Sequence, residues 1–205
     1  MTSLWLTRAL EESRARGFLG PGEIEPQILH ASGFAHAWNS YRADPPTTIL
    51  DLGSGGGLPG LVLLDTWAHP TTFLDSMEKR TNFLLEVLAW DDVPSGGSVW
   101  RGRAEALARE TRSDARFSLV TARSFGPPGV TAECAVRFLH IGGLLIVSEP
   151  PDGTDRWSAA GLDELGLVSR GTYRTSAGYK VIEKIRPTPL RFPRATGTPG
   201  KHPIF

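Results

Sequence analysis

Ile49-Leu-Asp-Leu-Gly-Ser-Gly-Gly-Gly-Leu-Pro-Gly60 is the stretch that decides the fold. Its apolar beginning is typical of a buried strand, and the glycines that follow predict a tight loop. Residues 61–64 are again apolar and predict a helix, with Pro59 near its first turn, where a missing N–H costs nothing. A glycine loop between a strand and a helix lets the backbone approach a ligand at the carboxyl end of the strand. The stretch therefore predicts an α/β protein with a binding site at this loop.

The loop allows more than one ligand. Residues 55–60 match G-x-G-x-x-G, which is the pattern of dinucleotide-binding loops. Asp51, in the sequence Asp-Leu-Gly-x-Gly, is more similar to the adenosylmethionine loop of class I methyltransferases, and it would crowd the phosphates of a dinucleotide. A strand–turn–helix without any ligand is the third interpretation. We expect Asp51, Gly53, Gly55 and Leu58 to form the cofactor-binding loop.

Composition sets the class of protein. The chain has 205 residues, 40% of them hydrophobic and 21% charged, which is typical of a globular protein. The formal net charge is zero, so any basic surface for nucleic acid must be local. Cys134 is the single cysteine and lies among small apolar residues, which favours a core position over a nucleophile. We expect a cytoplasmic protein without a membrane segment, because no apolar run is long enough to span a bilayer.

Three segments are expected. Residues 1–46 predict a short helical N-terminal segment, with helices at 3–16 and after Pro26; the second presents Ile28, Phe34 and Trp38 on one face. His30 and His36 lie on that helix, and we assign them to surface or structural positions, with no metal site. Residues 47–185 predict the ligand-binding domain, and residues 186–205 a basic extended tail.

Strands and helices alternate through the central domain. After the first strand we expect strands at 71–75, 98–101, 117–121 and 144–148, with helices at 79–88, 104–109, 130–138 and 157–165. The last two strands, at 167–173 and 180–185, are expected to pair as a hairpin. This order predicts a mostly parallel, Rossmann-like sheet of seven strands with an antiparallel edge strand.

Three positions are candidates for the site. Asp75 ends the second strand, where an acid accepts hydrogen bonds from ribose hydroxyls; its alternative role is to cap the next helix. Ala104 and Glu105 follow the third strand, where an adenine would lie, although Glu105 also suits the first turn of a helix. Arg123 follows the fourth strand and is expected to orient a carboxylate, a phosphate or a nucleobase, or to form a surface ion pair.

The tail carries Arg186, Arg191, Arg194 and Lys201 and contains no acid. Its prolines argue against a helix, so we expect an extended strip that contacts RNA phosphates or is simply solvated. Because the predicted pocket uses only the loop and the strands, truncation after Ile185 is expected to leave cofactor binding nearly unchanged.

Together these motifs resemble one family. They are Asp51-Leu-Gly-Ser-Gly-Gly-Gly-Leu-Pro-Gly60, then Leu74-Asp-Ser76 with Lys79-Arg80, then Gly102-Arg-Ala-Glu105, then Thr121-Ala-Arg123, and the Pro- and Gly-rich ending. They are similar to the small-subunit ribosomal RNA guanine-N7 methyltransferase family, also called the glucose-inhibited division protein B family. Two positions depart from its pattern: His30 stands in an incomplete His-x-x-Asp-Ser element, and Glu149 stands where Lys-Gly is usual.

The resemblance implies a class I methyltransferase that uses S-adenosylmethionine to methylate N7 of a guanine in 16S ribosomal RNA. Carried over residue by residue, Gly53, Leu58, Ala104, Glu105 and Arg123 would contact the cofactor, and Asp75 would bind its ribose. We assign no catalytic base, because N7 carries a lone pair and no proton. We expect a monomer whose partner is 16S RNA or the small ribosomal subunit. The alternatives are a methyltransferase of the same lineage with a small-molecule or other non-RNA substrate, and a nicotinamide-dependent reductase.

Overall fold

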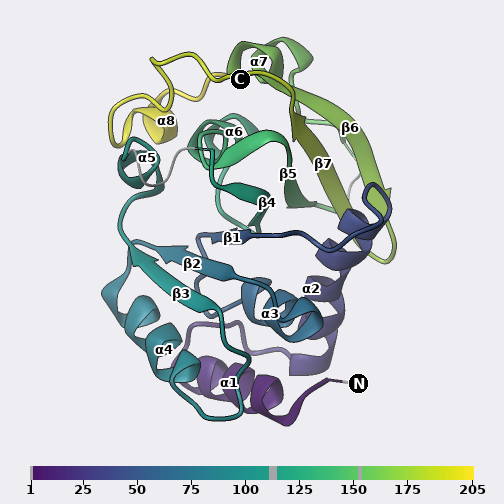
Figure 1. The fold of residues 1–205 in the computed structure, drawn as a ribbon, viewed down its shortest axis with the longest axis vertical. Coiled ribbons are helices and arrows are strands. Elements are labelled where there is room, and N and C mark those ends of the chain that lie inside the picture. Colours follow the sequence, from purple (N-terminus) through teal and green to yellow (C-terminus); the bar gives the residue numbers. More distant parts are fainter. Residues whose placement is uncertain (1, 111–114, 152–153) are drawn as a thin grey trace.

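The computed structural model describes residues 2–110, 115–151 and 154–205, which form helices around one seven-stranded sheet (Figure 1). The strand order is β3-β2-β1-β4-β5-β7-β6. The strands are β1 (Ile49–Leu52), β2 (Thr71–Asp75), β3 (Gly97–Arg101), β4 (Phe117–Ala122), β5 (Leu139–Glu149), β6 (Leu167–Arg174) and β7 (Gly178–Lys184).

The predicted fold class is confirmed. Strands β1 to β5 run parallel, while β7 runs antiparallel between β5 and the edge strand β6. Strands β6 and β7 pair as the expected hairpin. Strand β5 starts five residues earlier than expected, because Leu139 pairs with Phe117 ahead of an irregularity in the register. The order reverses at β1 and β4, so a crevice opens outside the carboxyl ends of these two strands.

Helices cover both faces of the sheet. Residues of β1 alternate between the layers: Leu50 and Leu52 pack in one apolar cluster and Ile49 in another. The first cluster takes its helical residues from α5, α6 and α7, and the clusters on the other face take theirs from α1 to α4. The helices are α1 (Leu4–Ala15), α2 (Ile24–Asn39), α3 (Gly60–Trp67), α4 (Glu78–Leu88), α5 (Ala104–Leu107), α6 (Pro128–Ala135), α7 (Ala159–Leu165) and α8 (Thr198–Lys201).

The N-terminal segment packs as its sequence predicts. Helix α2 buries Ile28, Phe34 and Trp38, the apolar face expected from the spacing. Phe34 meets the Tyr179 ring of β7 edge-on at 5.1 Å between centroids, so α2 lies against the antiparallel end of the sheet. Among the described residues, no helix combines the length and hydropathy needed to cross a membrane.

Candidate active site

The glycine loop turns sharply at the end of β1. Gly53 has a φ of +74°, a left-handed conformation that L side chains rarely adopt. A Cβ atom on Gly53 would also lie 2.6 Å from the ring of Phe125, so both the backbone conformation and the lack of space require glycine at this position. Leu58 points away from this surface; its side chain is buried in the apolar cluster beneath the loop. The loop therefore exposes its backbone near Gly53 and anchors itself through Leu58.

Asp51 lies inside the protein and holds the loop in place. Its carboxylate accepts hydrogen bonds from the Gly60 N–H at 3.0 Å and the Thr121 hydroxyl at 3.1 Å. It joins the end of β1 to β4 and to the start of α3. Burial raises the pKa of Asp51 to about 6, and the hydrogen bonds and the charge of Arg123 only partly oppose that effect. The predicted cofactor-binding residue Asp51 therefore supports the loop from behind, and its carboxylate does not line the cavity described below.

This raised pKa predicts a pH-dependent stability. Because the folded-state pKa lies above the ordinary value of 3.8, folding favours protonated Asp51, and stability falls as the pH rises from about 4 to about 6. Asn at this position does not titrate. We expect the unfolding free energy of the native protein, relative to Asp51→Asn, to fall by about 2–3 kcal/mol over this range. Urea titrations of both proteins at several pH values measure the two unfolding free energies. A difference between them that does not change with pH would contradict the raised pKa of Asp51.

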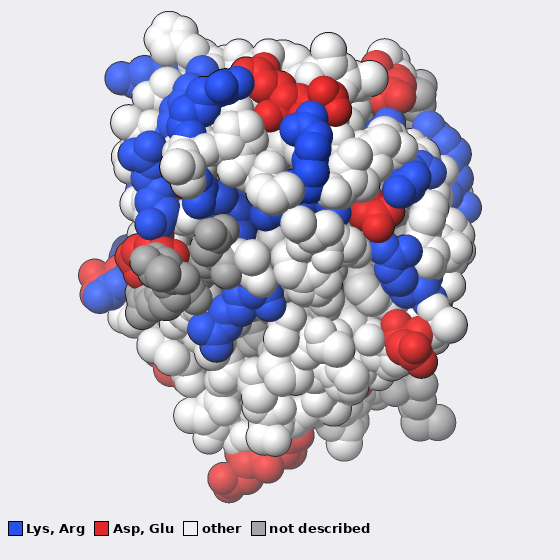
Figure 2. Space-filling model, turned by 45° about the horizontal axis from the view of Figure 1, so that its top comes forward, with Lys and Arg blue, Asp and Glu red and all other residues white. Residues whose placement is uncertain are grey.

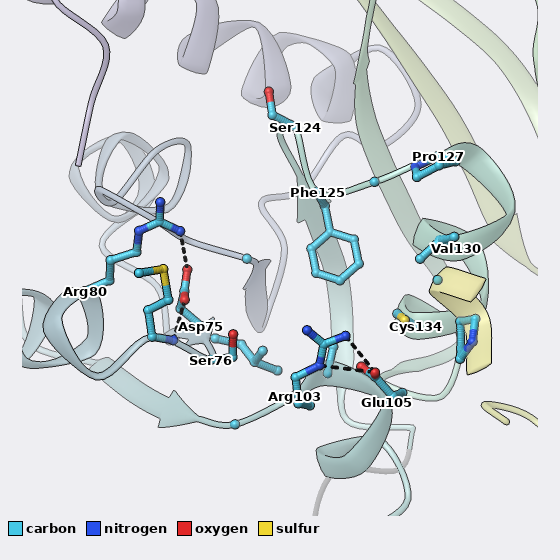
Figure 3. Close-up of a pocket in the computed structure, with 18 residues that line it drawn as sticks. Asp75, Ser76, Arg80, Arg103, Glu105, Ser124, Phe125, Pro127, Val130 and Cys134 are labelled. Carbon is cyan, nitrogen blue, oxygen red and sulfur yellow. Dashed lines mark hydrogen bonds and ion pairs between the residues drawn. The ribbon is translucent and has the colours of Figure 1, made fainter. Parts of the chain in front are cut away.

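A cavity of about 400 Å³ opens at the carboxyl ends of β1 to β4, a size suited to a small-molecule cofactor. Four of the residues predicted to bind the cofactor line it: Gly53, Asp75, Ala104 and Glu105 (Figure 3). Figure 3 shows the Phe125 ring pointing into the space between the Asp75 and Val130 sides of the cavity. Gly55 and Leu58 are not among the lining residues. Gly55 instead donates its N–H to Asp75.

Asp75 occupies the position expected of a ribose ligand, and it also performs the alternative role. Its carboxylate accepts from the Gly55 N–H at 2.9 Å and from the Met77 N–H at 2.8 Å, at the start of α4. Arg80 lies 3.6 Å from the same carboxylate. Each oxygen of an ionised carboxylate can accept two hydrogen bonds, so Asp75 retains capacity for hydroxyl donors in the cavity.

We expect Asp75→Ala to weaken adenosylmethionine binding by about 1–3 kcal/mol, because ribose hydroxyls would lose a charged acceptor. Calorimetric titration measures the change. Glu78→Ala is the matched control, since Glu78 lies in the first turn of α4 and pairs with Arg101 at the surface. Equal affinity of Asp75→Ala and the native protein, with the fold intact, would reduce Asp75 to a capping residue.

Glu105 connects the cavity to the tail. Its Oε1 atom accepts from the Arg103 guanidinium at 2.9 Å and from the Gly197 N–H at 3.0 Å. Burial raises the pKa of Glu105, but these hydrogen bonds and its own backbone N–H outweigh burial and lower it overall. The contacts with Arg103 and Gly197 all involve Oε1, and each carboxylate oxygen can accept two hydrogen bonds, so the carboxylate retains capacity for an amino-group donor such as that of adenine.

The tail corrects two expectations. Thr198–Lys201 is helical, although prolines were expected to prevent a helix here. Pro199 lies in the first turn, where proline is tolerated. Pro199 and Gly200 line the cavity, and Gly197 donates to Glu105, so the expectation that the pocket uses only the loop and the strands is wrong. The effect of truncation after Ile185 on cofactor binding stays untested, and this lining argues that it would be large. The physical reason is burial: Phe192 is 2% exposed, and the chain end packs beside Trp157 through Phe205.

Three of the four basic residues of the tail have acidic partners. Arg186 pairs with Asp163, Arg191 with Glu164 and Arg194 with the fully buried Glu133; among the described residues, the exposed Lys201 has no acidic partner. Their contact with RNA stays a prediction. Figure 2 turns the top of Figure 1 toward the reader. On this face Lys and Arg side chains are spread out, with Asp and Glu side chains among them.

A second cavity, of about 370 Å³, adjoins the first and shares Ser124, Phe125 and Gly126 with it. Arg123 lines this second cavity and not the first. Among the described residues, the buried Arg123 Nη1 has no hydrogen-bond partner. Burial lowers the pKa of Arg123, an effect that the charge of Asp51 opposes. An arginine held in this way is suited to bind an acceptor group on a ligand.

The second cavity also contains two residues, His30 and Glu149, that the sequence analysis does not assign to a site. His30 lines it, and the buried His30 Nδ1 has no partner among the described residues. Burial, and then the charge of Arg123, lower the pKa of His30, so the ring is neutral near pH 7. Glu149 lines the cavity from the end of β5. The sequence names His30 only as a departure from the family pattern; the packing of α2 on β7 is what brings it to the cavity.

Two other chemistries find no support here. Burial, reinforced by the charges of Glu105 and Glu133, raises the pKa of the Cys134 thiol to about 12, so the thiol stays protonated and packs as an apolar group, as expected. Within the described ranges, His, Cys, Asp and Glu side chains form no group of three that could hold a metal ion.

Comparison with known proteins gives a consistent result. Residues 24–149 match the family model described as GidB, rRNA small subunit methyltransferase G. The ribosomal RNA small subunit methyltransferase G of Streptococcus agalactiae serotype V is 32% identical over 173 residues, covering 80% of this chain and 73% of that protein. Its namesake from Chloroflexus aggregans is 33% identical over 193 residues, covering 88% and 78%.

Solved structures share the fold at low identity. A putative O-methyltransferase from Klebsiella pneumoniae has a TM-score of 0.61 at 14% identity, over 91% of this chain and 92% of that one. The cofactor-bound protein Rv0187 from MTB has a TM-score of 0.62 at 16% identity, over 89% and 90%.

Proposed function

The chain belongs to the rRNA small subunit methyltransferase G family, and on that premise we propose that it transfers a methyl group from S-adenosylmethionine to N7 of a guanine in 16S ribosomal RNA. The observation that carries this proposal is the pair of adjoining cavities, one lined by Asp75 and Glu105 and the other by Arg123. Two reactants need two pockets with a common wall. Family membership excludes the nicotinamide-dependent reductase considered from the loop pattern.

The first cavity suits the cofactor. Asp75 would accept hydrogen bonds from the ribose, the carboxylate of Glu105 and the backbone of Ala104 would meet the adenine, and Gly53 would let the methionyl chain pass close to the loop. When bound, S-adenosylmethionine supplies an electrophilic methyl group on a sulfonium ion. Residues 47–185 form the methyltransferase domain in this proposal, residues 1–46 cover one face of its sheet, and the tail completes the cofactor cavity.

The second cavity suits the base. Methyl transfer would join the in-plane lone pair of guanine N7 to the methyl carbon, and the electron pair of the carbon–sulfur bond would go to sulfur. Because N7 carries no proton, this step needs no general base. The task of the protein is alignment, and Arg123 would orient the base through its unpartnered N–H groups. The target must be unpaired for its edges to enter the cavity.

The test compares ribosomal RNA from a deletion strain with that of the parent. Primer extension after cleavage at N7-methylguanine reports the modification at single-nucleotide resolution. We expect one N7-methylguanine of 16S RNA to disappear in the deletion strain and to return with the native gene. An unchanged set of N7-methylguanines would favour the alternative, in which a methyltransferase of this lineage acts on a small molecule or another non-RNA substrate.

In this proposal the enzyme is a cytoplasmic monomer. Lys201 in the tail allows a test of its RNA binding. Removing one cation that neutralises an RNA phosphate lowers the slope of log affinity against log salt by about 1. We expect Lys201→Ala to reduce this slope by about 1 and to weaken binding to any RNA sequence alike. Arg8→Ala, at a surface ion pair with Asp92 far from the tail, is the control. A slope identical to that of the native protein would remove Lys201 from the RNA-binding surface.

A further inference from the structure

Glu149 is a carboxylate that the cofactor cavity does not use. It ends β5, and its side chain is 6% exposed. Its Oε1 accepts a hydrogen bond from the Trp157 indole N–H at 3.0 Å, and its Oε2 lies 3.5 Å from an Arg156 guanidinium nitrogen. These contacts fix the carboxylate at the wall of the second cavity, which Trp157 and Arg156 also line.

The second cavity thus combines two kinds of hydrogen-bonding group. Arg123 supplies N–H donors, one of them without a partner among the described residues, and Glu149 supplies acceptors only. A carboxylate has about four acceptor sites, and the contacts with Trp157 and Arg156 occupy two of them. A ligand that fits this cavity must therefore present an acceptor beside a row of donors.

Guanine has this pattern along one edge. Its O6 is an acceptor, and next to it N1–H and N2–H₂ form a row of donors that a carboxylate can accept in one plane. Adenine presents a lone pair at N1 and no amino group at C2, so a buried carboxylate would repel it. The N7 atom lies on the opposite side of the purine, away from the edge that the carboxylate would hold.

We propose that Glu149 is a specificity-determining residue that binds the N1–H and N2–H₂ donors of the acceptor guanine, while Arg123 faces O6. This inference rests on the proposed function and adds to it the group that selects the base. Holding the Watson–Crick edge at Glu149 leaves N7 free toward the wall of Ser124, Phe125 and Gly126 that both cavities share. The base must then be unpaired, since Glu149 takes the place of a pairing cytosine.

The test replaces the target guanosine of 16S RNA with inosine, by ligation of RNA fragments. Inosine keeps N7, O6 and N1–H but lacks the C2 amino group. For the native enzyme we expect inosine to lower kcat/KM and RNA affinity by about 10- to 100-fold, the discrimination typical of a two-point base contact. For Glu149→Gln we expect kcat/KM with guanosine RNA to fall by a similar factor relative to the native enzyme. With inosine RNA, Glu149→Gln should have a kcat/KM only slightly below that of the native enzyme.

Glu183→Gln is the matched control, because Glu183 pairs with Arg42 and Arg170 on β7 and does not line either cavity. It should show the native preference for guanosine over inosine. An equal penalty for inosine in the native enzyme and in Glu149→Gln would overturn the inference. If Glu149→Gln does not fold, the native enzyme alone still tests the inference. Equal kcat/KM of the native enzyme for guanosine and inosine RNA would overturn the inference. A native enzyme that leaves guanosine RNA unmethylated would instead overturn the proposed function, and this inference with it.

Discussion

Replacing Arg194 with methionine should lower the free energy of unfolding by about 3–5 kcal/mol, because it leaves a buried carboxylate without its partner. The Glu133 side chain is 0% exposed, and the Arg194 guanidinium donates to both of its oxygens, at 2.9 and 2.6 Å. The backbone N–H of Arg194 donates to the same carboxylate. Arg194 thus fixes the tail on α6, and urea denaturation measures its contribution.

Arg191→Met is the matched control for this prediction. Arg191 lies three residues earlier in the same tail and pairs with Glu164 at the surface, where both side chains are largely exposed. An exposed pair contributes about 0–1 kcal/mol. If the two variants lose the same stability, the tail is held by its apolar residues and not by the buried ion pair. Because the tail lines the cofactor cavity, we also expect Arg194→Met, at temperatures where it stays folded, to bind adenosylmethionine more weakly.

Arg123→Lys should lower kcat/KM for RNA by about 100-fold or more, although the charge is retained. A lysine ammonium cannot reproduce the planar fork of a guanidinium. Misplacing a reactant by about 1 Å lowers the rate by about 100-fold. Because Arg123 lines the second cavity and not the first, the affinity for adenosylmethionine should change little. Methyl-transfer kinetics and calorimetry together separate the two effects.

Arg170→Lys is the control for Arg123. Arg170 pairs with Glu183 on the outer hairpin, and neither residue lines a cavity described here. Full activity of Arg123→Lys would show that charge alone suffices at this position. A loss of cofactor affinity equal to the loss of kcat/KM would place Arg123 in the cofactor site, as the family resemblance implies.

Local sequence was enough to predict the sheet and the part of the crevice that Asp75 and Glu105 line. The strand before Gly53, the alternation of strands with helices and the acid at Asp75 are patterns within a few residues of one another. Parallel strands bring their carboxyl ends to one edge, so Asp75 and Glu105 meet in one cavity as their positions after β2 and β3 predict. Asp51 is predictable from the same local pattern, but the inward direction of its carboxylate, toward Gly60 and Thr121, follows only from the packed structure.

Tertiary structure decided the rest, because the deciding contacts join residues that are far apart in sequence. Gly197 reaches Glu105 across 92 positions, and Arg194 reaches Glu133 across 61, so no local pattern could reveal that the tail closes the cofactor cavity. His30 comes to the second cavity through helix packing, and β5 and β4 bring Glu149 and Arg123 to its wall. The sequence alone therefore determined the fold and the glycine loop after β1. The folded chain determined which charges are paired, and which are left facing a substrate, because burial and long-range pairing exist only once the layers have packed.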